Sequence, residues 1–315
     1  MILITGGMGY IGSHIVKRLN AEGVAIRCLL PAGTPHQLPE SEICEVVQGN
    51  LLDEELLFQA VTGVHTIIHL QSAQWWGSLR DLERIDLGLT RALIAAARAA
   101  RVGRLIALSH LGSTPASAYP LLRIKGRQEE LIRSSGLAYT IIRSALVFGP
   151  RDAFINHLAM MLKATPFVFL MPGQGEIVLQ PIYIDDLVDL LVESLEQIDS
   201  IDTTIEVGGP EYITLEDLLN TVMRVTGTYR TIIPTPPYVL RWLTALYRRL
   251  FRRSLVTDQW LDLLATNRAA PLGNTITHFG VHPRRLEDTL LNYLPDEVNG
   301  MSTLRYALRR RPRGI

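Results

Sequence analysis

The chain has 315 residues, and its 31 lysines and arginines balance its 31 aspartates and glutamates. This neutral balance gives no overall electrostatic reason to expect nucleic-acid binding. Cys28 and Cys44 are too few for a disulfide framework, and no Cys/His cluster has the spacing of a metal site. The apolar start "MILIT" leaves no room for a targeting peptide and no later apolar run can span a bilayer, so we expect a soluble, cytoplasmic protein.

Short apolar runs alternate with helical patterns over the first 150 residues. Near-continuous apolar strands separated by helices are typical of a parallel sheet that is covered on both faces. The clearest helical pattern is "RALIAAARAARVG", for which Gly103 is the expected stop. The pattern predicts a doubly wound α/β fold with strands at residues 1–5, 24–30, 45–49, 66–70, 104–109 and 138–144.

A glycine-rich turn, "ITGGMGYIGSHIVKRL", follows the first predicted strand directly and contains two overlapping glycine triplets. Glycine permits the sharp turn, the approach of the backbone to a pyrophosphate and the close packing of the next helix. The helix N-terminus adds free N–H groups and a partial positive charge. A merely structural turn is the alternative. The pattern predicts a Rossmann-type site for NAD(P)(H) at Gly6, Gly7, Met8, Gly9, Tyr10, Ile11 and Gly12.

The end of the second predicted strand bears on the choice between NAD and NADP. A carboxylate there would bind the ribose 2′-hydroxyl, but Leu30 is followed by Pro31. The missing negative charge slightly favours NADP(H), although Arg27 and His36 are only nearby and not at the strand end. Asn50, after the third strand, could reach the adenine, whereas Asp53 is expected to cap the next helix. The remaining residues assigned to the cofactor site are Leu30, Leu51, Leu70 and Gln71.

Several of these motifs resemble the extended and atypical short-chain dehydrogenase/reductase superfamily, which includes NAD-dependent epimerases and dehydratases. They are "TGGMGYIG", "GNLLD", "IIHL" and "IIRSALVFGP", within residues 1–220. The later segments "LQPIYIDDLVDLL", "DQWLDLLATNRAAP" and "FGVHPRRLEDTLLNYL" resemble the branch that contains the nucleotide-binding accessory subunit of respiratory complex I and its bacterial relatives. The resemblance implies NAD(P) binding, with a lysine on the nicotinamide ribose and a tyrosine four residues before it for proton transfer.

The predicted catalytic pair is incomplete. Lys125 matches the lysine of the superfamily, but Leu121 stands four residues before it. Residues four apart share a helix face, whereas Tyr119 lies six residues before Lys125, roughly 240° around a straight helix. Pro120 is the expected first helical residue, which places Tyr119 in the preceding loop. We therefore expect Lys125 to bind a ribose without a standard tyrosine partner.

Other polar side chains are candidates near the nicotinamide. Ser109 ends the fifth predicted strand, where the superfamily places a polar group, and His110 could act as an acid or base or be an ordinary loop histidine. Arg143 could order the loop that leads to the second domain. Trp75 and Trp76 follow the fourth strand and could wall a pocket or simply pack. No carboxylate completes a metal site with His65 and His69, so we expect these two to be core or edge histidines.

The chain after residue 150 is expected to form a smaller α+β region interleaved with the Rossmann-type domain. Residues 1–150 make the dinucleotide-binding domain, to which residues 182–209 return, and residues 151–181 and 210–315 make the smaller region. Within it, "TLEDLLNTVMRVTG" has Thr214 as its expected N-cap. This arrangement would place any substrate or partner region beside the cofactor.

A charge asymmetry is hidden in the basic helix predicted over residues 238–254. Its apolar residues follow helical spacing, and it carries five arginines without an acid. Such a helix can lie on an anionic membrane or an acidic partner, or pack on the body with its arginines in water. The expected apolar face is Val239, Leu243, Leu246 and Leu250; the arginines are Arg241, Arg248, Arg249, Arg252 and Arg253, and the tail adds Arg305, Arg309, Arg310, Arg311 and Arg313.

Two functional hypotheses follow. The first is an NAD(P)(H)-binding protein whose cofactor is structural or regulatory, cytoplasmic or peripheral at a membrane, with no nucleic-acid partner. The second is an active oxidoreductase or nucleotide-sugar epimerase/dehydratase acting on a small molecule, which would use Lys125 with Ser109 and either Tyr119 or His110. A pure interaction module with an empty nucleotide site fits the complete glycine loop least well.

Overall fold

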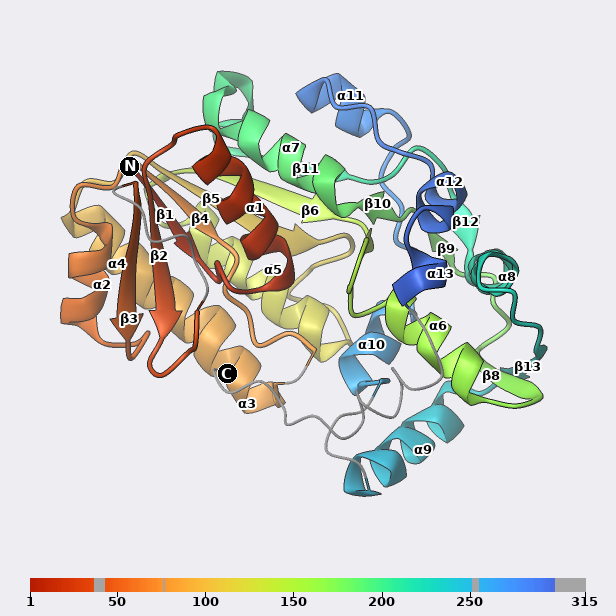
Figure 1. Cartoon of the computed structure of the whole chain (residues 1–315). Coiled ribbons are helices and arrows are strands. Elements are labelled where there is room, and N and C mark those ends of the chain that lie inside the picture. Colours follow the sequence, from red (N-terminus) through yellow and green to blue (C-terminus); the bar gives the residue numbers. More distant parts are fainter. Residues whose placement is uncertain (37–42, 76, 251–254, 298–315) are drawn as a thin grey trace.

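A computed structural model describes residues 1–36, 43–75, 77–250 and 255–297. Its central sheet has seven strands, all parallel, in the order β11-β6-β5-β4-β1-β2-β3 (Figure 1). The sheet confirms the expected Rossmann-type α/β fold. Its strands are β1 (Ile2–Thr5), β2 (Ile26–Pro31), β3 (Cys44–Gly49), β4 (Thr66–His69), β5 (Arg104–His110), β6 (Ala138–Ser144) and β11 (Thr203–Val207).

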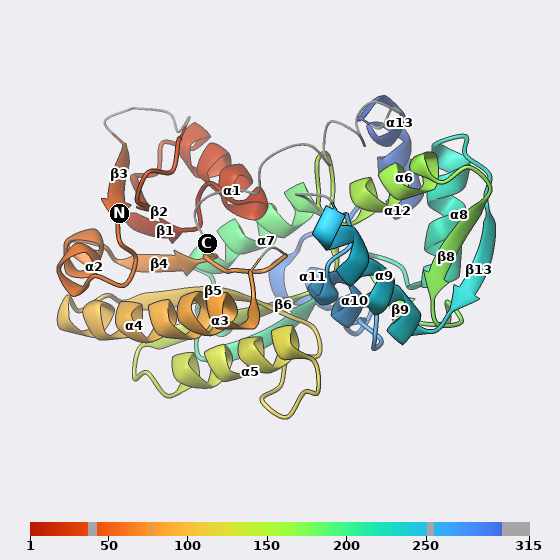
Figure 2. The same ribbon diagram turned by 90° about the horizontal axis from the view of Figure 1, so that it is seen from below.

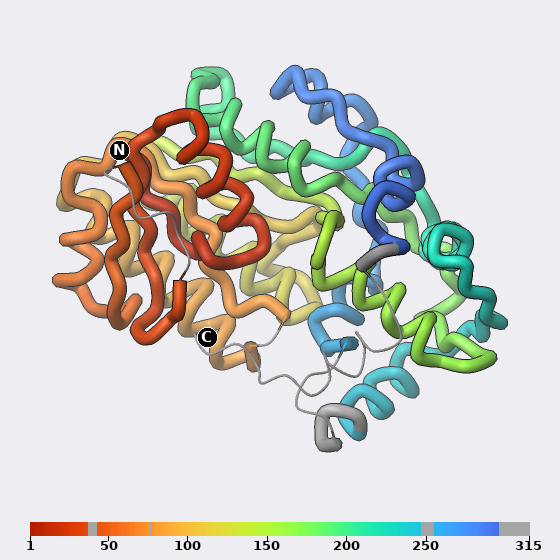
Figure 3. The backbone as a smooth tube through the Cα atoms, viewed as in Figure 1, coloured from red at the N-terminus to blue at the C-terminus, as the bar shows by residue number. Residues whose placement is uncertain are grey.

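Helices cover both faces of this sheet, as Figure 2 shows from below. Apolar residues of α1 and α7 pack on one face, and those of α2, α4 and α5 pack on the other. The C-terminal segment, blue in Figure 3, returns past α7 and places α11 beside it. These helices are α1 (Tyr10–Ala21), α2 (Glu54–Val61), α4 (Thr90–Ala99), α5 (Pro120–Arg133), α7 (Ile184–Glu196) and α11 (Asn274–Phe279).

A second apolar core holds together the C-terminal region, by which we mean residues 151–181 and the described residues after 209. Phe154 and Trp260 stack on each other within this core. Short strand pairs link this region to the sheet through β7–β10 and support it through β9–β12 and β8–β13. The elements are β7 (Val147–Phe148), α6 (Ile155–Ala164), β8 (Val168–Pro172), β9 (Val178–Leu179), β10 (Ile182–Tyr183), β12 (Ile213–Thr214), α8 (Leu215–Val225), β13 (Thr231–Thr235), α9 (Pro237–Leu250), α10 (Asp258–Leu263), α12 (Leu286–Leu291) and α13 (Leu294–Glu297).

The segment before α4 is wound differently from the expected helix. After the short helix α3 (Leu79–Leu82), residues Glu83–Leu89 form a π-helix that runs into α4. The helix ends at Ala99 and not at Gly103, because Arg101 adopts the left-handed conformation with φ 57°. The wider π-helical turn matters for the site because it carries Asp86.

Two expected helix caps are present. Asp53 accepts a hydrogen bond from the Leu56 backbone N–H at the start of α2, and Thr214 accepts one from the Asp217 N–H at the start of α8. Both satisfy backbone donors that have no partner within the helix. Local sequence therefore predicts these two helix starts correctly.

A buried carboxylate at the start of α6 was not expected from the sequence. Asp152 accepts hydrogen bonds from the backbone N–H groups of Phe154 and Ile155, each at 2.6 Å, and from the Asn156 amide. Burial raises the pKa of Asp152 to about 6, although these hydrogen bonds act to lower it. The folded protein thus holds this proton more tightly than the unfolded chain, whose aspartates titrate near pH 4.

This pKa predicts a pH-dependent stability. Because the pKa of Asp152 is raised in the folded state, its contribution to the free energy of unfolding increases as pH falls from about 6 to about 4. Relative to Asp152→Asn, the wild type should gain about 2 kcal/mol over that range. Urea unfolding of both proteins across the pH range measures it. A stability difference that does not change with pH would contradict the prediction.

The arginine-rich helix is present as α9, but its packed side differs from the expected one. Leu240 packs against the C-terminal core and Thr244 is buried, whereas Leu246, expected on the packed face, is 46% exposed. Arg241 is paired with Asp262 and not simply solvated. The reason is tertiary: α9 lies against β8 and α10, which select the side that carries Leu240. Residues 251–254 and the arginines of the tail lie outside the described residues.

Candidate functional site

The glycine loop between β1 and α1 forms a tight backbone cradle. Gly6 has φ +74°, and a Cβ atom on it would lie 2.8 Å from the Gln71 backbone nitrogen. A Cβ atom on Gly12 would lie 2.2 Å from the Gly6 carbonyl oxygen. The Gly9 N–H donates to that same oxygen at 2.9 Å. Only glycine fits at Gly6 and Gly12, as a phosphate-binding turn requires.

The helix that follows the cradle has an open N-terminus. Gly9 is the N-cap of α1, no side chain caps the first turn, and that turn contains no acid. Its backbone donors and partial positive charge are therefore available to an anion. Met8 and Gly9 are exposed, and Tyr10 and Ile11 are half-buried. The cradle and this helix end fit the pyrophosphate of a dinucleotide.

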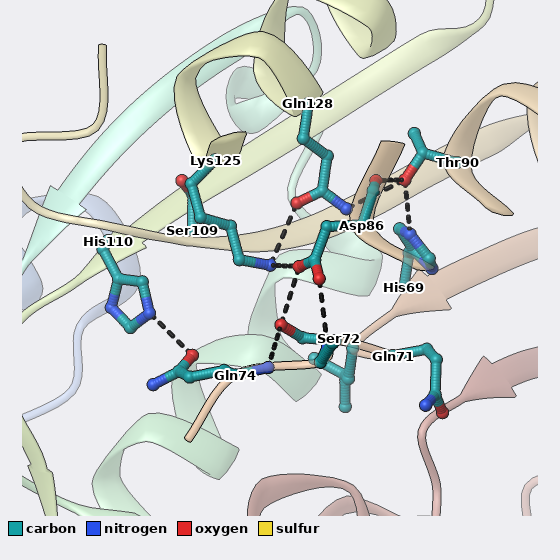
Figure 4. Close-up of polar contacts among 12 residues, drawn as sticks. His69, Gln71, Ser72, Gln74, Asp86, Thr90, Ser109, His110, Lys125 and Gln128 are labelled. Atoms are coloured by element: carbon teal, nitrogen blue, oxygen red, sulfur yellow. Dashed lines mark hydrogen bonds and ion pairs between the residues drawn. The ribbon is translucent and has the colours of Figure 1, made fainter. Parts of the chain in front are cut away.

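Lys125 is held by a buried ion pair that the sequence analysis did not anticipate (Figure 4). Its Nζ lies 2.7 Å from Oδ1 of Asp86 and donates to Oε1 of Gln128 at 3.0 Å. The side chains of Lys125 and Asp86 are 5% and 0% exposed. Asp86 also accepts hydrogen bonds from the Ser72 hydroxyl and the Ala73 N–H. These contacts use two of the three N–H donors of Lys125, so the third can serve a ribose hydroxyl.

His69 belongs to the same network and is not a metal ligand. Its Nδ1 lies 2.7 Å from the Thr5 hydroxyl and its Nε2 lies 2.9 Å from the Thr90 hydroxyl. Burial, then the charge of Lys125, lowers the pKa of His69 to about 4, although Asp86 opposes the shift. Thr90 also accepts from Gln128. Among the described residues there is no cluster of histidine, cysteine and acidic side chains that could hold a metal.

Leu121 occupies the position where the superfamily has its tyrosine. It is fully buried and packs with Leu82, Ile85 and Ile124 in a small apolar cluster. Tyr119 is the N-cap of α5 and Pro120 is the first helical residue, which confirms that the tyrosine lies outside the helix. Tyr119 is half-buried, and its backbone N–H donates to the Ser117 hydroxyl. The helix therefore presents an aliphatic side chain, not a phenol, one turn from Lys125.

Ser109 is oriented by a second buried carboxylate. Its hydroxyl donates to Oε1 of Glu129 at 2.6 Å. Arg143 donates to both oxygens of Glu129, at 3.0 and 2.7 Å, and to the Ser113 carbonyl in the loop after β5. Arg143 thus holds the loop after β5, whereas the sequence suggested a role in the loop that leads to the second domain. The Ser109 hydroxyl is therefore hydrogen-bonded to the Glu129–Arg143 ion pair.

His110 and the loop after β4 form the remaining polar part of the site. The Nε2 of His110 lies 2.8 Å from Oε1 of Gln74. Burial, then the charges of Arg268 and Lys125, lowers the pKa of His110 well below its usual value. A lowered pKa makes the imidazole a weak base, so His110 takes up a proton less readily than an ordinary histidine does.

Trp75 is half-buried and adopts the left-handed conformation with φ 75°. Its backbone N–H donates to the side chain of Gln259 in α10, and its ring packs against apolar cores of both regions. It therefore packs between the helices α3 and α5, which lie beside the sheet, and the C-terminal region. Trp76 lies outside the described residues.

The other residues assigned to the cofactor site gather at the carboxyl edge of the sheet. Leu30 and Leu51 are buried. Leu70 and Gln71 are half-buried, and both donate their backbone N–H groups to the Thr5 hydroxyl. Asn50 is exposed and accepts from the Leu52 N–H. Arg27 is engaged by Glu45 on the surface and faces no strand end.

Asp86, the main determinant of how Lys125 is held, was not predicted from the sequence. Asp86 stands two residues before Gly88, inside what reads as an ordinary polar turn of a helix. Its pairing depends on the π-helical winding and on the packing of α5 beside it. One signal was available: an acid within the apolar pattern "LERIDLGLTRALI" requires a partner if it is buried.

Comparison with known proteins agrees with this geometry. Residues 6–151 match the family described as NAD(P)H-binding. The seven-stranded sheet, the glycine cradle and this match define a Rossmann-type NAD(P)H-binding domain. Among solved structures, the NADPH-dependent quinone oxidoreductase QOR2 of Escherichia coli, complexed with NADPH, shares the fold. It has a TM-score of 0.74 and 20% identity, covering 93% of this chain and 99% of that one.

Curated relatives place the chain more finely. It is 28% identical over 259 residues to alpha subcomplex subunit 9 of the mitochondrial NADH dehydrogenase [ubiquinone] of Mus musculus, covering 78% of this chain and 66% of that protein. It is 25% identical over 308 residues to the photosystem II assembly factor Ycf39 of Guillardia theta, covering 94% and 93%. The chain spans about two thirds of the mouse protein's length. These matches confirm the resemblance to the atypical short-chain dehydrogenase/reductases.

Proposed function

We propose that this protein binds NAD(P)(H) as a structural or regulatory cofactor and does not turn it over. The glycine cradle and the open N-terminus of α1 would hold the pyrophosphate. Lys125 would bind the nicotinamide ribose through its remaining N–H. A bound nicotinamide supplies hydride transfer, which in a catalyst needs a partner that exchanges a proton with the substrate.

The Lys125–Asp86 ion pair is the observation that carries this proposal. In an active site of the superfamily type, an uncompensated lysine charge lowers the pKa of the tyrosine. Here a carboxylate 2.7 Å away compensates that charge, and Leu121 replaces the phenol. Ser109 is committed to Glu129, and His110 is a weak base. The tyrosine is therefore absent from the helix, the Ser109 hydroxyl is already hydrogen-bonded, and His110 is too weak a base for proton transfer.

The preference for NADP(H) over NAD(H) remains part of the proposal. No acid stands at the end of β2, where it would repel a 2′-phosphate. The Thr34 hydroxyl just beyond that strand is buried without a hydrogen-bond partner in the structure, and a ribose or phosphate oxygen could supply one.

The relatives support an attached role. One is named as a subunit of a respiratory enzyme and the other as an assembly factor. We therefore propose that this protein acts in the cytoplasm or peripherally at a membrane, held there or to an assembly by its arginine-rich C-terminal region. None of the described helices is both long and apolar enough to cross a bilayer.

Titration of the purified protein with NADPH and NADH tests the proposal. We expect saturable binding, seen as a rise in melting temperature, with NADPH bound more tightly. In the presence of quinone, carbonyl or nucleotide-sugar substrates, the bound NADPH should not be oxidised. Tyr119→Phe and His110→Gln should bind NADPH like the wild type. Turnover that is abolished by Lys125→Ala would instead establish the active-enzyme alternative, and no binding of either dinucleotide would refute both.

A further inference from the structure

The two-stranded sheet of β8 and β13 has an uncovered apolar face. The strands pair in parallel with Val168 opposite Thr231 and Leu170 opposite Ile233. Residues paired in register point to the same face, and Val168, Leu170 and Ile233 are all exposed. The intervening Phe169 and Met171 point the other way, into the C-terminal core. One face of this small sheet is therefore apolar and open to solvent.

The helix that follows β13 carries an exposed apolar stripe. Tyr238, Trp242 and Leu246 lie four residues apart in α9 and are 73%, 65% and 46% exposed. Their spacing puts them on one side of the helix, opposite the side of Leu240 that packs on the core. Exposed aromatic residues at such spacing are unusual on a surface without a partner.

These two surfaces are neighbours. Only Pro236 separates β13 from α9, and α9 contacts β8. Phe167 and Tyr229, which precede the two strands, are 79% and 80% exposed. We call the set the docking surface; it consists of Phe167, Val168, Leu170, Tyr229, Ile233, Tyr238, Trp242 and Leu246.

The chain segment that forms most of the docking surface carries positively charged side chains and no acidic ones. Residues 218–257, which include β13 and α9, contain no aspartate or glutamate. The same residues contain seven arginines: Arg224, Arg230, Arg241, Arg248, Arg249, Arg252 and Arg253. Two of them are paired with acids from outside the segment, Arg224 with Glu287 and Arg241 with Asp262. In a chain of zero net charge, a segment with seven arginines and no acid favours a negatively charged partner.

We propose that the docking surface binds the headgroup layer of a membrane that contains anionic lipids. Tyrosine and tryptophan are the side chains that prefer this layer, because their rings are apolar and their polar atoms remain hydrated. Aliphatic residues beside them reach the acyl chains, and arginines contact the lipid phosphates. An acidic protein partner would satisfy the charge, but it would not require so many exposed aromatic and aliphatic residues on the two-stranded sheet and the helix beside it.

This inference deepens the attachment proposed above and does not depend on cofactor turnover. The docking surface belongs to the C-terminal region, whereas the glycine cradle lies between β1 and α1, at the carboxyl ends of the strands of the seven-stranded sheet (Figure 2). Vesicle binding and dinucleotide binding can therefore be measured separately on the same preparation. Loss of one without the other shows which proposal has failed.

Co-sedimentation with lipid vesicles tests the inference on the full chain. We expect binding to phosphatidylcholine vesicles that contain phosphatidylglycerol, weaker binding to phosphatidylcholine alone, and release at high salt. The double variant Tyr238→Ser, Trp242→Ser should partition about tenfold less or weaker still. Ile198→Ser removes a 79% exposed isoleucine that lies just after α7, in the part of the chain that covers the seven-stranded sheet, and this variant should bind as the wild type does.

Three outcomes would overturn the inference. The first is no binding of the wild type to anionic vesicles. The second is equal binding by the double variant, provided that its melting temperature and its NADPH titration match the wild type. The third is a wild-type dimer in solution that Tyr238→Ser, Trp242→Ser dissociates, because the surface would then be an interface between two copies of this chain.

Discussion

Replacing Gly12 with alanine is expected to abolish dinucleotide binding. The new Cβ atom would lie 2.2 Å from the Gly6 carbonyl oxygen and 2.8 Å from the Gly7 Cα, so backbone must move. A side chain can rotate away from such an overlap, but this backbone is the phosphate cradle itself. We expect the free energy of unfolding to fall by about 3 kcal/mol and NADPH to cause no rise in melting temperature.

Gly88→Ala is the matched control for this substitution. Gly88 also lies in a helical segment beside the site, but its added Cβ atom would meet Leu52 Cδ2 at 3.7 Å and the Glu83 carbonyl oxygen at 3.8 Å, both ordinary contact distances. We expect NADPH titration and urea unfolding of this variant to resemble the wild type. If Gly12→Ala bound NADPH normally, the cradle would not be the phosphate site.

Asp86→Ala should be among the most destabilising substitutions near the site. It leaves the ammonium of Lys125 buried without its carboxylate, which typically costs about 3 to 5 kcal/mol. It also removes the acceptor of the Ser72 hydroxyl and the Ala73 N–H, so the loop after β4 should loosen. Urea unfolding measures the loss, and the NADPH titration should show weaker binding because Lys125 is no longer positioned.

The double variant Asp86→Leu, Lys125→Met separates the buried charge from the packing. Because both charges are removed together, it should recover at least half of the stability that Asp86→Ala loses. Its NADPH binding should stay weak, since the ribose ligand is gone. A double variant less stable than Asp86→Ala would show that the loss of stability comes mainly from the missing ion pair and not from the unpaired lysine charge.

The parts of the site that the sequence could predict are those set by neighbours along the chain. The glycine cradle, the N-caps Asp53 and Thr214 and the place of Tyr119 before Pro120 depend on a few consecutive residues. Apolar periodicity likewise predicts the parallel sheet. These features follow from local backbone geometry, which can be predicted from a few consecutive residues of one sequence.

Features that depend on distant packing could not be predicted. Lys125 was recognised, but its partner Asp86 lies in a π-helix whose winding the sequence pattern does not reveal. Asp152 looks like an ordinary loop residue until burial raises its pKa. In α9 the pattern identified an amphipathic helix, but β8 and α10 decide which side packs, and Leu246 is left exposed. Which polar groups are buried therefore cannot be predicted from the sequence alone.

The most direct test of a bound but unreacting cofactor is a crystal structure of the protein grown with NADPH. The account predicts that Nζ of Lys125 donates to the nicotinamide ribose while it remains paired with Asp86. Leu121 should stay buried, and the Tyr119 hydroxyl should lie out of hydrogen-bonding range of the nicotinamide and its ribose. A structure with the Tyr119 hydroxyl hydrogen-bonded to the ribose beside a free Lys125 ammonium would contradict it.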